Sequence, residues 1–176
     1  MPPAVIITGL PMTLDSTDIE LLNLLQEDSK RAAKELGIAL DMPITTVYTK
    51  IKRMEELGFV RRYTAILDAP KLGLTATAFV LATFSYDSRT EVAPSQREVA
   101  KQVARFPEVQ EVHVISGDWD LLIKVKTRDV DAVGRFVVDK LRTVRGIEKT
   151  VTCMVFDTAK ETPDISLRRS WDSILP

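Results

Sequence analysis

Hydroxyl-bearing and basic side chains gather on one predicted helix, residues 44–57, in an arrangement that suits contacts with DNA. Val47, Ile51 and Met54 recur at the spacing of one helix face and are expected to be buried. The other side chains should then face outward. Hydroxyls can hydrogen-bond to bases or phosphates, and Lys and Arg bind phosphates or guanine edges. The candidate DNA contacts on this helix are Thr45, Thr46, Tyr48, Thr49, Lys50, Lys52 and Arg53.

The basic character continues past the end of this helix. Residues 50–62 contain five basic and two acidic residues, whereas residues 14–27 contain four acidic and no basic ones. Arg61 and Arg62 are further candidate contacts, because a wing or strand at this point would lie over the phosphate backbone. A run of Lys and Arg is more often a solvated surface. Its position on the last of three short helices favours DNA binding here.

Two further helices are predicted before the basic one. The first is capped by Asp15 or Ser16 and ends at Glu27, and the second covers about residues 30–40. Pro43 cannot continue the second helix but can begin the third. Three short helices with a tight turn between the last two form a helix-turn-helix, whose third helix can enter the major groove. We therefore predict an N-terminal arm over residues 1–13 and a helix-turn-helix domain over residues 14–62.

After a linker at residues 63–72 the pattern changes to strands rich in β-branched and aromatic residues. The fold class that follows is α+β, with an N-terminal (winged) helix-turn-helix domain followed by a C-terminal ferredoxin-like βαββαβ domain. This second domain covers residues 73–158 and precedes a C-terminal tail at residues 159–176. The predicted strands are residues 72–86, 109–116, 120–127 and 147–157, and the predicted helices are residues 94–106 and 130–146.

The first of these strands predicts self-association. Helices of a ferredoxin-like domain cover only one face of the sheet. An apolar second face therefore needs a partner, and we expect a homodimer. Apolar residues lie on both faces of the strand, with Ala76, Ala78 and Val80 on one and Thr77, Phe79 and Leu81 on the other.

The turn between the two middle strands, Gly117-Asp118-Trp119-Asp120, is a natural hairpin turn, and its residues have groups that suit a small ligand. Gly117 would let a small ligand approach the backbone, whose N–H groups can hold a carboxylate. Asp118 or Asp120 could pair with an ammonium group. Taken alone, such a turn is more often only a hairpin.

Composition narrows the class of protein. The 176 residues carry 24 basic and 25 acidic side chains, so a DNA-binding role depends on local charge. One cysteine excludes an internal disulfide framework and a Cys-based zinc site, and no metal or cofactor is predicted. The longest apolar stretch, residues 73–84, is shorter than the ~20 residues of a membrane span. We expect a soluble cytoplasmic protein with no membrane partner.

Several of these motifs resemble those of Lrp/AsnC transcription regulators. Leu14-Asp15-x-x-Asp18-x-x-Leu21-Leu22 is similar to the family's opening helix, and residues 52–65 are similar to the end of its recognition helix and its linker strand. Residues 116–121 resemble the hairpin of its effector domain. The resemblance extends over residues 14–157, with three departures. The second helix carries Lys30-Arg31-Ala32-Ala33-Lys34 where the family usually has a glycine and a more apolar start, Asp41 stands where glycine is usual, and Pro43 stands at the usual Ser cap.

The resemblance implies a sequence-specific regulator, not an enzyme, that binds a pseudo-palindromic site on double-stranded DNA. It also implies dimers that assemble further, to tetramers or octamers. A small-molecule effector such as an amino acid would bind between neighbouring dimers, near the hairpin and two threonines of the last strand. The implied effector residues are Gly117, Asp118, Trp119, Asp120, Thr150 and Thr152.

A second interpretation stays open. Tetrapyrrole decarboxylases resemble the same two-domain arrangement and use histidine near the sheet, so the chain could be a metabolite-binding or decarboxylase-like oligomer with a vestigial helix-turn-helix. His113 is the only histidine, and it has no adjoining tyrosine. Together with the basic third helix, this favours the regulator.

Overall fold

The computed structural model describes residues 14–85 and 95–167. The predicted N-terminal arm and the end of the predicted tail lie outside the described residues. The chain divides into two compact units. One unit combines Met1–Ala65 with Glu161–Pro176, and the other is Ile66–Lys160. Part of the predicted tail therefore joins the N-terminal unit.

The first helix, α1 (Ser16–Glu27), begins with a reciprocal cap. The Asp15 carboxylate accepts a hydrogen bond from the Asp18 N–H at 2.7 Å, and the Asp18 carboxylate accepts one from the Asp15 N–H at 3.0 Å. Two otherwise unpaired N–H groups are thereby satisfied. Of the two predicted caps, Asp15 and Ser16, Asp15 is the one that caps the helix.

The second helix, α2 (Ala33–Ala39), is shorter than predicted. Lys30 lies before it, in a turn where its N–H donates to the Asp28 carboxylate at 2.9 Å. The turn after α2 depends on Gly37, because a Cβ there would lie 2.7 Å from the carbonyl oxygen of Met42. Asp41 takes a φ of 49° in the same turn. Aspartate tolerates this left-handed conformation better than most residues, which explains how it replaces the family's glycine.

The third helix, α3 (Ile44–Glu56), begins directly after Pro43. Val47 and Met54 are fully buried against the leucines of α1, and Ile51 packs beside them, as the helical spacing predicts. Phe59 and Val60 close the same core. Residues 61–68 form no helix or strand, and in the described part of the chain they pair with no strand.

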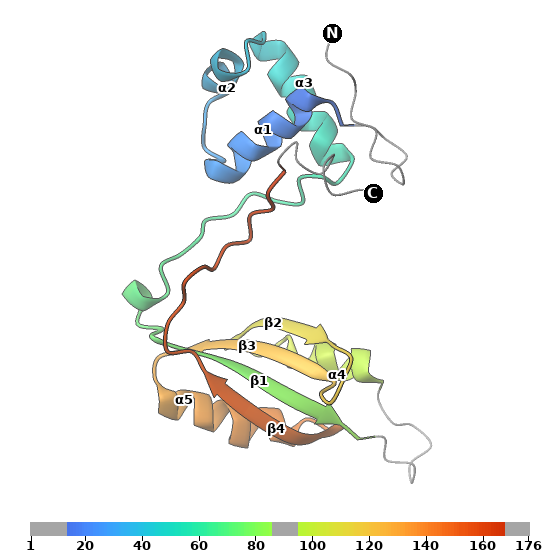
Figure 1. Cartoon of the computed structure of the whole chain (residues 1–176), viewed down its shortest axis with the longest axis vertical. Coiled ribbons are helices and arrows are strands. Elements are labelled where there is room, and N and C mark those ends of the chain that lie inside the picture. The colour runs from blue at the N-terminus through green and yellow to red at the C-terminus, as the bar shows by residue number, and fades with distance from the viewer. Residues whose placement is uncertain (1–13, 86–94, 168–176) are drawn as a thin grey trace, which may run out of the picture. The chain divides into compact units, whose positions relative to one another are not determined.

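The second unit has the predicted β-α-β-β-α-β order, and its four strands form one antiparallel sheet in the order β2-β3-β1-β4 (Figure 1). The predicted fold class is confirmed. Its main elements are β1 (Ala76–Phe84), α4 (Gln96–Val103), β2 (Val109–Val114), β3 (Leu121–Thr127), α5 (Val130–Arg135) and β4 (Ile147–Met154).

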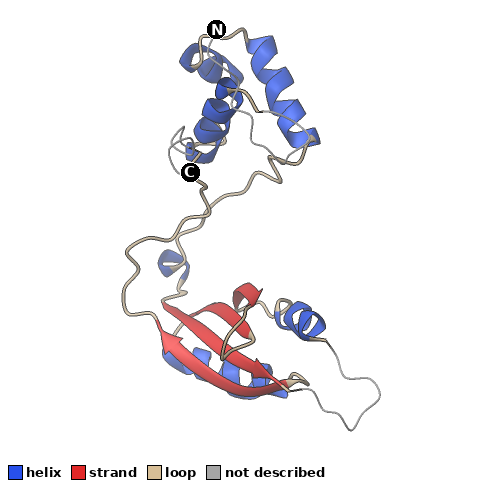
Figure 2. Ribbon diagram, turned by 45° about the vertical axis from the view of Figure 1, so that its right-hand side comes forward, coloured by secondary structure: helices blue, strands red, loops and turns tan. Residues whose placement is uncertain are grey.

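The core of this unit lies between one face of the sheet and the helices (Figure 2). Alternate residues of β1, from Ala76 to Phe84, are buried there, and the residues between them are half-buried. Phe106 packs edge-on against Phe136, with ring centroids 5.7 Å apart. Within this unit, no described helix packs on the opposite face of the sheet.

The predicted helix over residues 130–146 is divided into three parts. An α-helix ends at Arg135, a π-helical turn covers Phe136–Lys140, and a 3-10 turn covers Leu141–Thr143. Phe136, Val137 and Leu141 are buried along these turns. No described helix is long and apolar enough to cross a membrane.

Candidate nucleic-acid interface and ligand site

The outer face of α3 presents most of the side chains predicted to contact DNA. Tyr48 is 63% exposed, and the side chain of Lys52 is 76% exposed although it lies 3.7 Å from Glu56. The Thr49 hydroxyl donates to the carbonyl oxygen of Thr45 at 2.9 Å, so it meets solvent as an acceptor. Thr46 is half-buried. The exposed members of the predicted set are Thr45, Tyr48, Thr49, Lys52, Arg61 and Arg62.

The prediction that Lys50 faces outward is wrong. Its side chain is only 16% exposed, and its ammonium lies 2.6 Å from Asp15 and 2.8 Å from Asp18. The two carboxylates at the start of α1 draw the amine back toward the helix-turn-helix core. Lys50 therefore connects α3 to α1, and its ammonium does not lie on the outer face of α3.

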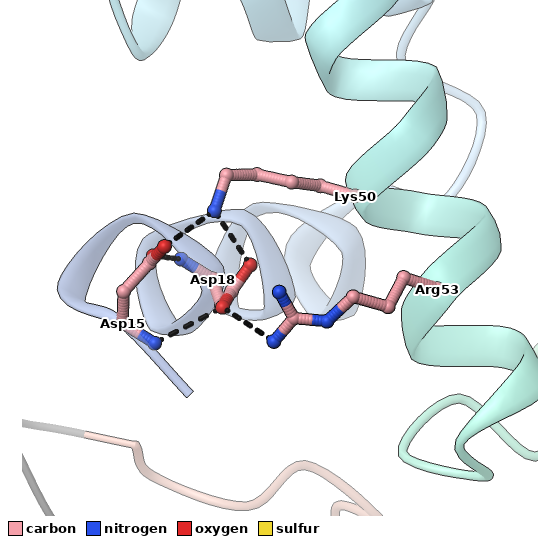
Figure 3. A network of polar contacts seen from close by, with 4 residues as sticks. All are labelled: Asp15, Asp18, Lys50 and Arg53. Atoms are coloured by element: carbon pink, nitrogen blue, oxygen red, sulfur yellow. Dashed lines mark hydrogen bonds and ion pairs between the residues drawn. The ribbon is translucent and has the colours of Figure 1, made fainter. Parts of the chain in front are cut away.

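Asp18 is the centre of this network (Figure 3). It is fully buried, and its carboxylate binds the Lys50 ammonium, the Asp15 N–H and the Arg53 guanidinium at 3.3 Å. Arg53 remains 42% exposed, so it can hold Asp18 and still meet a ligand outside. A buried carboxylate with several charged and N–H partners fixes the position of one helix on the other.

The stabilisation that this network gives is lost at both low and high pH. Burial opposes the charge of Asp15, but the hydrogen bond from Lys50 and the backbone hydrogen bonds outweigh it and lower the Asp15 pKa below 3.8. Its contribution to stability is present above that pH and is lost as the pH falls through the lowered pKa. For Lys50, the two carboxylates outweigh burial and raise the pKa above 10.5. That contribution is lost as the pH rises through the raised pKa.

Tyr63 fastens the segment after α3 to the helix. Its hydroxyl donates to the Glu55 carboxylate at 2.8 Å, and burial together with this acidic neighbour raises its pKa to about 12. We predict that the last tyrosine to ionise in a phenolate-absorbance titration has a midpoint well above 10.0. Tyr63→Phe should remove that late step. If the titration curve of Tyr63→Phe kept the same late midpoint, Tyr63 would not be the tyrosine that ionises last.

At the β2–β3 turn, the structure shows why Asp120 is aspartate. One carboxylate oxygen accepts the Phe84 N–H at 2.7 Å, and the other accepts the Gln96 side-chain amide at 2.6 Å. Asp120 thereby joins the end of β1 to the start of α4. Gly117, with a φ of 116°, and Asp118 are both exposed, and Trp119 is half-buried. Asp118 is thus the more accessible of the two carboxylates.

Of the two threonines of β4, Thr150 lies toward the end of the sheet that carries this turn, and Thr152 lies at the level of the middle of β1. Thr150 is opposite Ala82 of β1, whose carbonyl oxygen accepts the Asp120 N–H at 3.0 Å. Thr152 is opposite Val80 and is exposed, because β4 is an edge strand. One strand, β1, therefore separates the threonines from the turn. Contact of either with a ligand stays a prediction.

The uncovered face of the sheet carries a continuous apolar patch, which we call the open sheet face. Leu81 lies between Leu122 and Val151, and Phe79 lies beside Cys153. Charged groups border the patch on the β2 side: Lys124 lies 3.0 Å from Glu111 and 5.9 Å from the Phe79 ring centroid.

Comparison with known proteins assigns both units. The Lrp/AsnC ligand binding domain matches residues 77–165, and a winged helix-turn-helix DNA-binding domain matches residues 14–61. An uncharacterized HTH-type transcriptional regulator of Pyrococcus abyssi is 44% identical over 148 residues, which is 84% of this chain and 96% of the relative. The chain belongs to the Lrp/AsnC family. It is a transcriptional regulator with a helix-turn-helix domain and an Lrp/AsnC ligand-binding domain.

Further Lrp/AsnC relatives cover nearly the whole chain. The HTH-type transcriptional regulator FL11 of Pyrococcus horikoshii is 30% identical over 88% of this chain and 97% of its own. Among solved structures, a Neisseria meningitidis regulator in complex with L-Met has a TM-score of 0.81 at 29% identity, covering 88% of this chain and 97% of its own. An AsnC family regulator from Agrobacterium tumefaciens has a TM-score of 0.80 at 28% identity, covering 92% and 100%. These names are those of regulators and not of enzymes.

Sequence reasoning missed the positioning role of Asp18 in this Lrp/AsnC regulator. The Asp15-x-x-Asp18 spacing indicates a cap, but nothing local indicates that Asp18 also binds Lys50 and Arg53, which are more than 30 residues away. The role of Asp120 was missed for the same reason. A short polar side chain next to a turn gives no signal of a bond to the far end of β1.

Proposed function

We propose that the outer face of α3 reads a specific DNA sequence. The observation that carries this proposal is the position of Asp18, which is buried and binds both Lys50 and Arg53 of α3. A helix held this way can present hydroxyl and basic groups to base edges and phosphates in one fixed orientation. The proposed contacts are Thr45, Thr46, Tyr48, Thr49, Lys52, Arg53, Arg61 and Arg62, with Lys50 as a positioning residue.

The lysine with the freest ammonium on α3 gives the simplest test. We predict that Lys52→Ala weakens binding to every DNA sequence and reduces the slope of log affinity against log salt by about 0.9, the value for one phosphate. Fluorescence anisotropy with a labelled duplex, repeated at several salt concentrations, measures both the affinity and the slope. Lys101→Ala, an exposed lysine on α4, serves as the control and should leave the slope unchanged. An unchanged slope in Lys52→Ala would remove Lys52 from the phosphate contacts.

The proposed DNA-bound form is a homodimer paired through the open sheet face. The apolar patch around Leu81 and Phe79 is the surface that a second copy would cover, and the charged rim beside it suits a self-complementary contact. Two α3 helices would then meet half-sites one helical turn, or a multiple, apart on a pseudo-palindrome. Further assembly to tetramers or octamers, in the cytoplasm, is part of the proposal.

We also propose that a small zwitterionic effector such as an amino acid binds near the β2–β3 turn. The exposed backbone at Gly117 can hold a carboxylate, Asp118 can pair with an ammonium, and Thr150 and Thr152 offer hydroxyls. The L-Met complex of the Neisseria relative supports this choice of ligand class. Calorimetric titration with single amino acids, repeated on Asp118→Ala, tests it. Equal binding by both proteins would exclude Asp118 from the site.

A further inference from the structure

The chain returns to the helix-turn-helix unit after the sheet domain. Gln26, near the end of α1, binds the main chain of Ile165 twice: its side-chain N–H donates to the Ile165 carbonyl at 3.0 Å, and its side-chain oxygen accepts the Ile165 N–H at 2.8 Å. The Asn23 side chain donates to the Leu167 carbonyl at 3.4 Å. Two amide side chains one helical turn apart on α1 therefore hold an extended segment by its backbone.

The same segment adds to the core of the unit. Leu167 packs against the apolar cluster formed by the leucines of α1 with Val47 and Met54 of α3. This cluster has few fully buried side chains, because the three helices are only seven to thirteen residues long. A small core gains proportionally more from one additional leucine than a large one does.

We propose that residues 161–167, the C-terminal tether, complete the helix-turn-helix unit and give the chain a second mechanical connection between its two units. The chain leaves the first unit at Ala65 and enters it again at Glu161. If residues 161–167 were not docked, one extended segment would join the units. With the tether docked on α1, two segments join them, and independent rotation of the DNA-binding unit is restricted.

The tether also offers a route from ligand to DNA, and this part rests on the proposed function. Thr150 and Thr152 lie on β4. The chain continues from β4 to Ile165, which is hydrogen-bonded to Gln26 of α1. Helix α1 in turn holds α3 through Asp18 and Lys50. A ligand that changes the position of β4 would act on the recognition helix through this route as well as through residues 66–75.

Amide hydrogen exchange at Ile165 tests the docking directly, without DNA or ligand. In the full-length protein, NMR-detected exchange of the Ile165 N–H should be slowed at least about tenfold relative to an unstructured peptide, since its hydrogen bond to Gln26 must open first. Gln26→Ala should abolish this protection. Gln102→Ala, an exposed glutamine on α4, should leave it unchanged. Unprotected exchange in the natural protein would overturn the proposal.

Two truncations test whether the tether completes the unit. Ending the chain after Leu167 keeps the tether, whereas ending it after Lys160 removes it. We expect the first to unfold like the full-length protein and the second to show faster exchange at Leu21 and Leu22 of α1, with the sheet domain unchanged. Equal exchange in both truncations would contradict the proposal. DNA affinity is measured on the same samples. The exchange measurement tests the tether without DNA, so a failure of the proposed function would appear in the affinity and not in the exchange.

Discussion

Replacing Asp18 by alanine is expected to abolish DNA binding although Asp18 faces the interior of the unit. The substitution leaves the Lys50 ammonium and the Asp15 N–H without their buried partner and removes the contact between Asp18 and the Arg53 guanidinium. Removing one member of a buried ion pair costs about 3–5 kcal/mol of unfolding free energy. That is most of the stability expected of a small three-helix unit. Urea unfolding measures the loss of unfolding free energy, and amide hydrogen exchange in α1 shows whether the loss lies in the helix-turn-helix unit.

An exposed acid on the same helix gives the matched control. Glu27 pairs with Arg31 at 3.0 Å at the surface, and Glu27→Ala should change the free energy of unfolding by less than about 0.5 kcal/mol. Asp18→Asn keeps an oxygen for the Asp15 N–H and should lose less than Asp18→Ala. If Asp18→Ala unfolds and binds DNA like the natural protein, the account of how α3 is positioned is wrong.

The second large effect is expected on the open sheet face. Leu81 lies between Leu122 and Val151 at the centre of the apolar patch, so Leu81→Glu would bury two carboxylates against apolar side chains in the proposed dimer. We expect sedimentation velocity to show monomers. DNA affinity should fall by a factor of about 100 or more, because two half-sites are no longer bound together.

Val138→Glu controls for the added charge. Val138 is 60% exposed on the π-helical turn Phe136–Lys140, which lies in the helical layer of the second unit. This variant should stay a dimer and keep its DNA affinity. A dimeric Leu81→Glu protein would move the proposed interface away from the sheet.

Local patterns in the sequence were enough to predict most of the fold. The burial of Val47 and Met54 on α3 follows from helical spacing, and the Asp15 cap follows from a rule that involves only neighbouring residues. The alternation of β1 predicts its two faces for the same reason. The interruption of α5 at Phe136 was not predicted, because an apolar spacing suited to a helix does not exclude a wider π turn.

The features that sequence reasoning missed are contacts between distant residues. The helical spacing predicts Lys50 on the outer face, because its own helix gives no sign of Asp18, 32 residues earlier. The contact of the tail with α1 is not predictable from the sequence, because Gln26 and Ile165 are 139 residues apart and an amide that binds main chain leaves no side-chain pattern in its partner. Such pairings become visible only when the chain is folded.

The central claim is that this regulator recognises a specific DNA sequence through α3. Its most direct test is a salt titration of binding to the DNA upstream of its own gene, compared with an unrelated duplex of equal length. We predict tighter binding to its own upstream DNA at every salt concentration, with both affinities falling as salt rises. No binding to either duplex, or equal affinity for both, would contradict the claim.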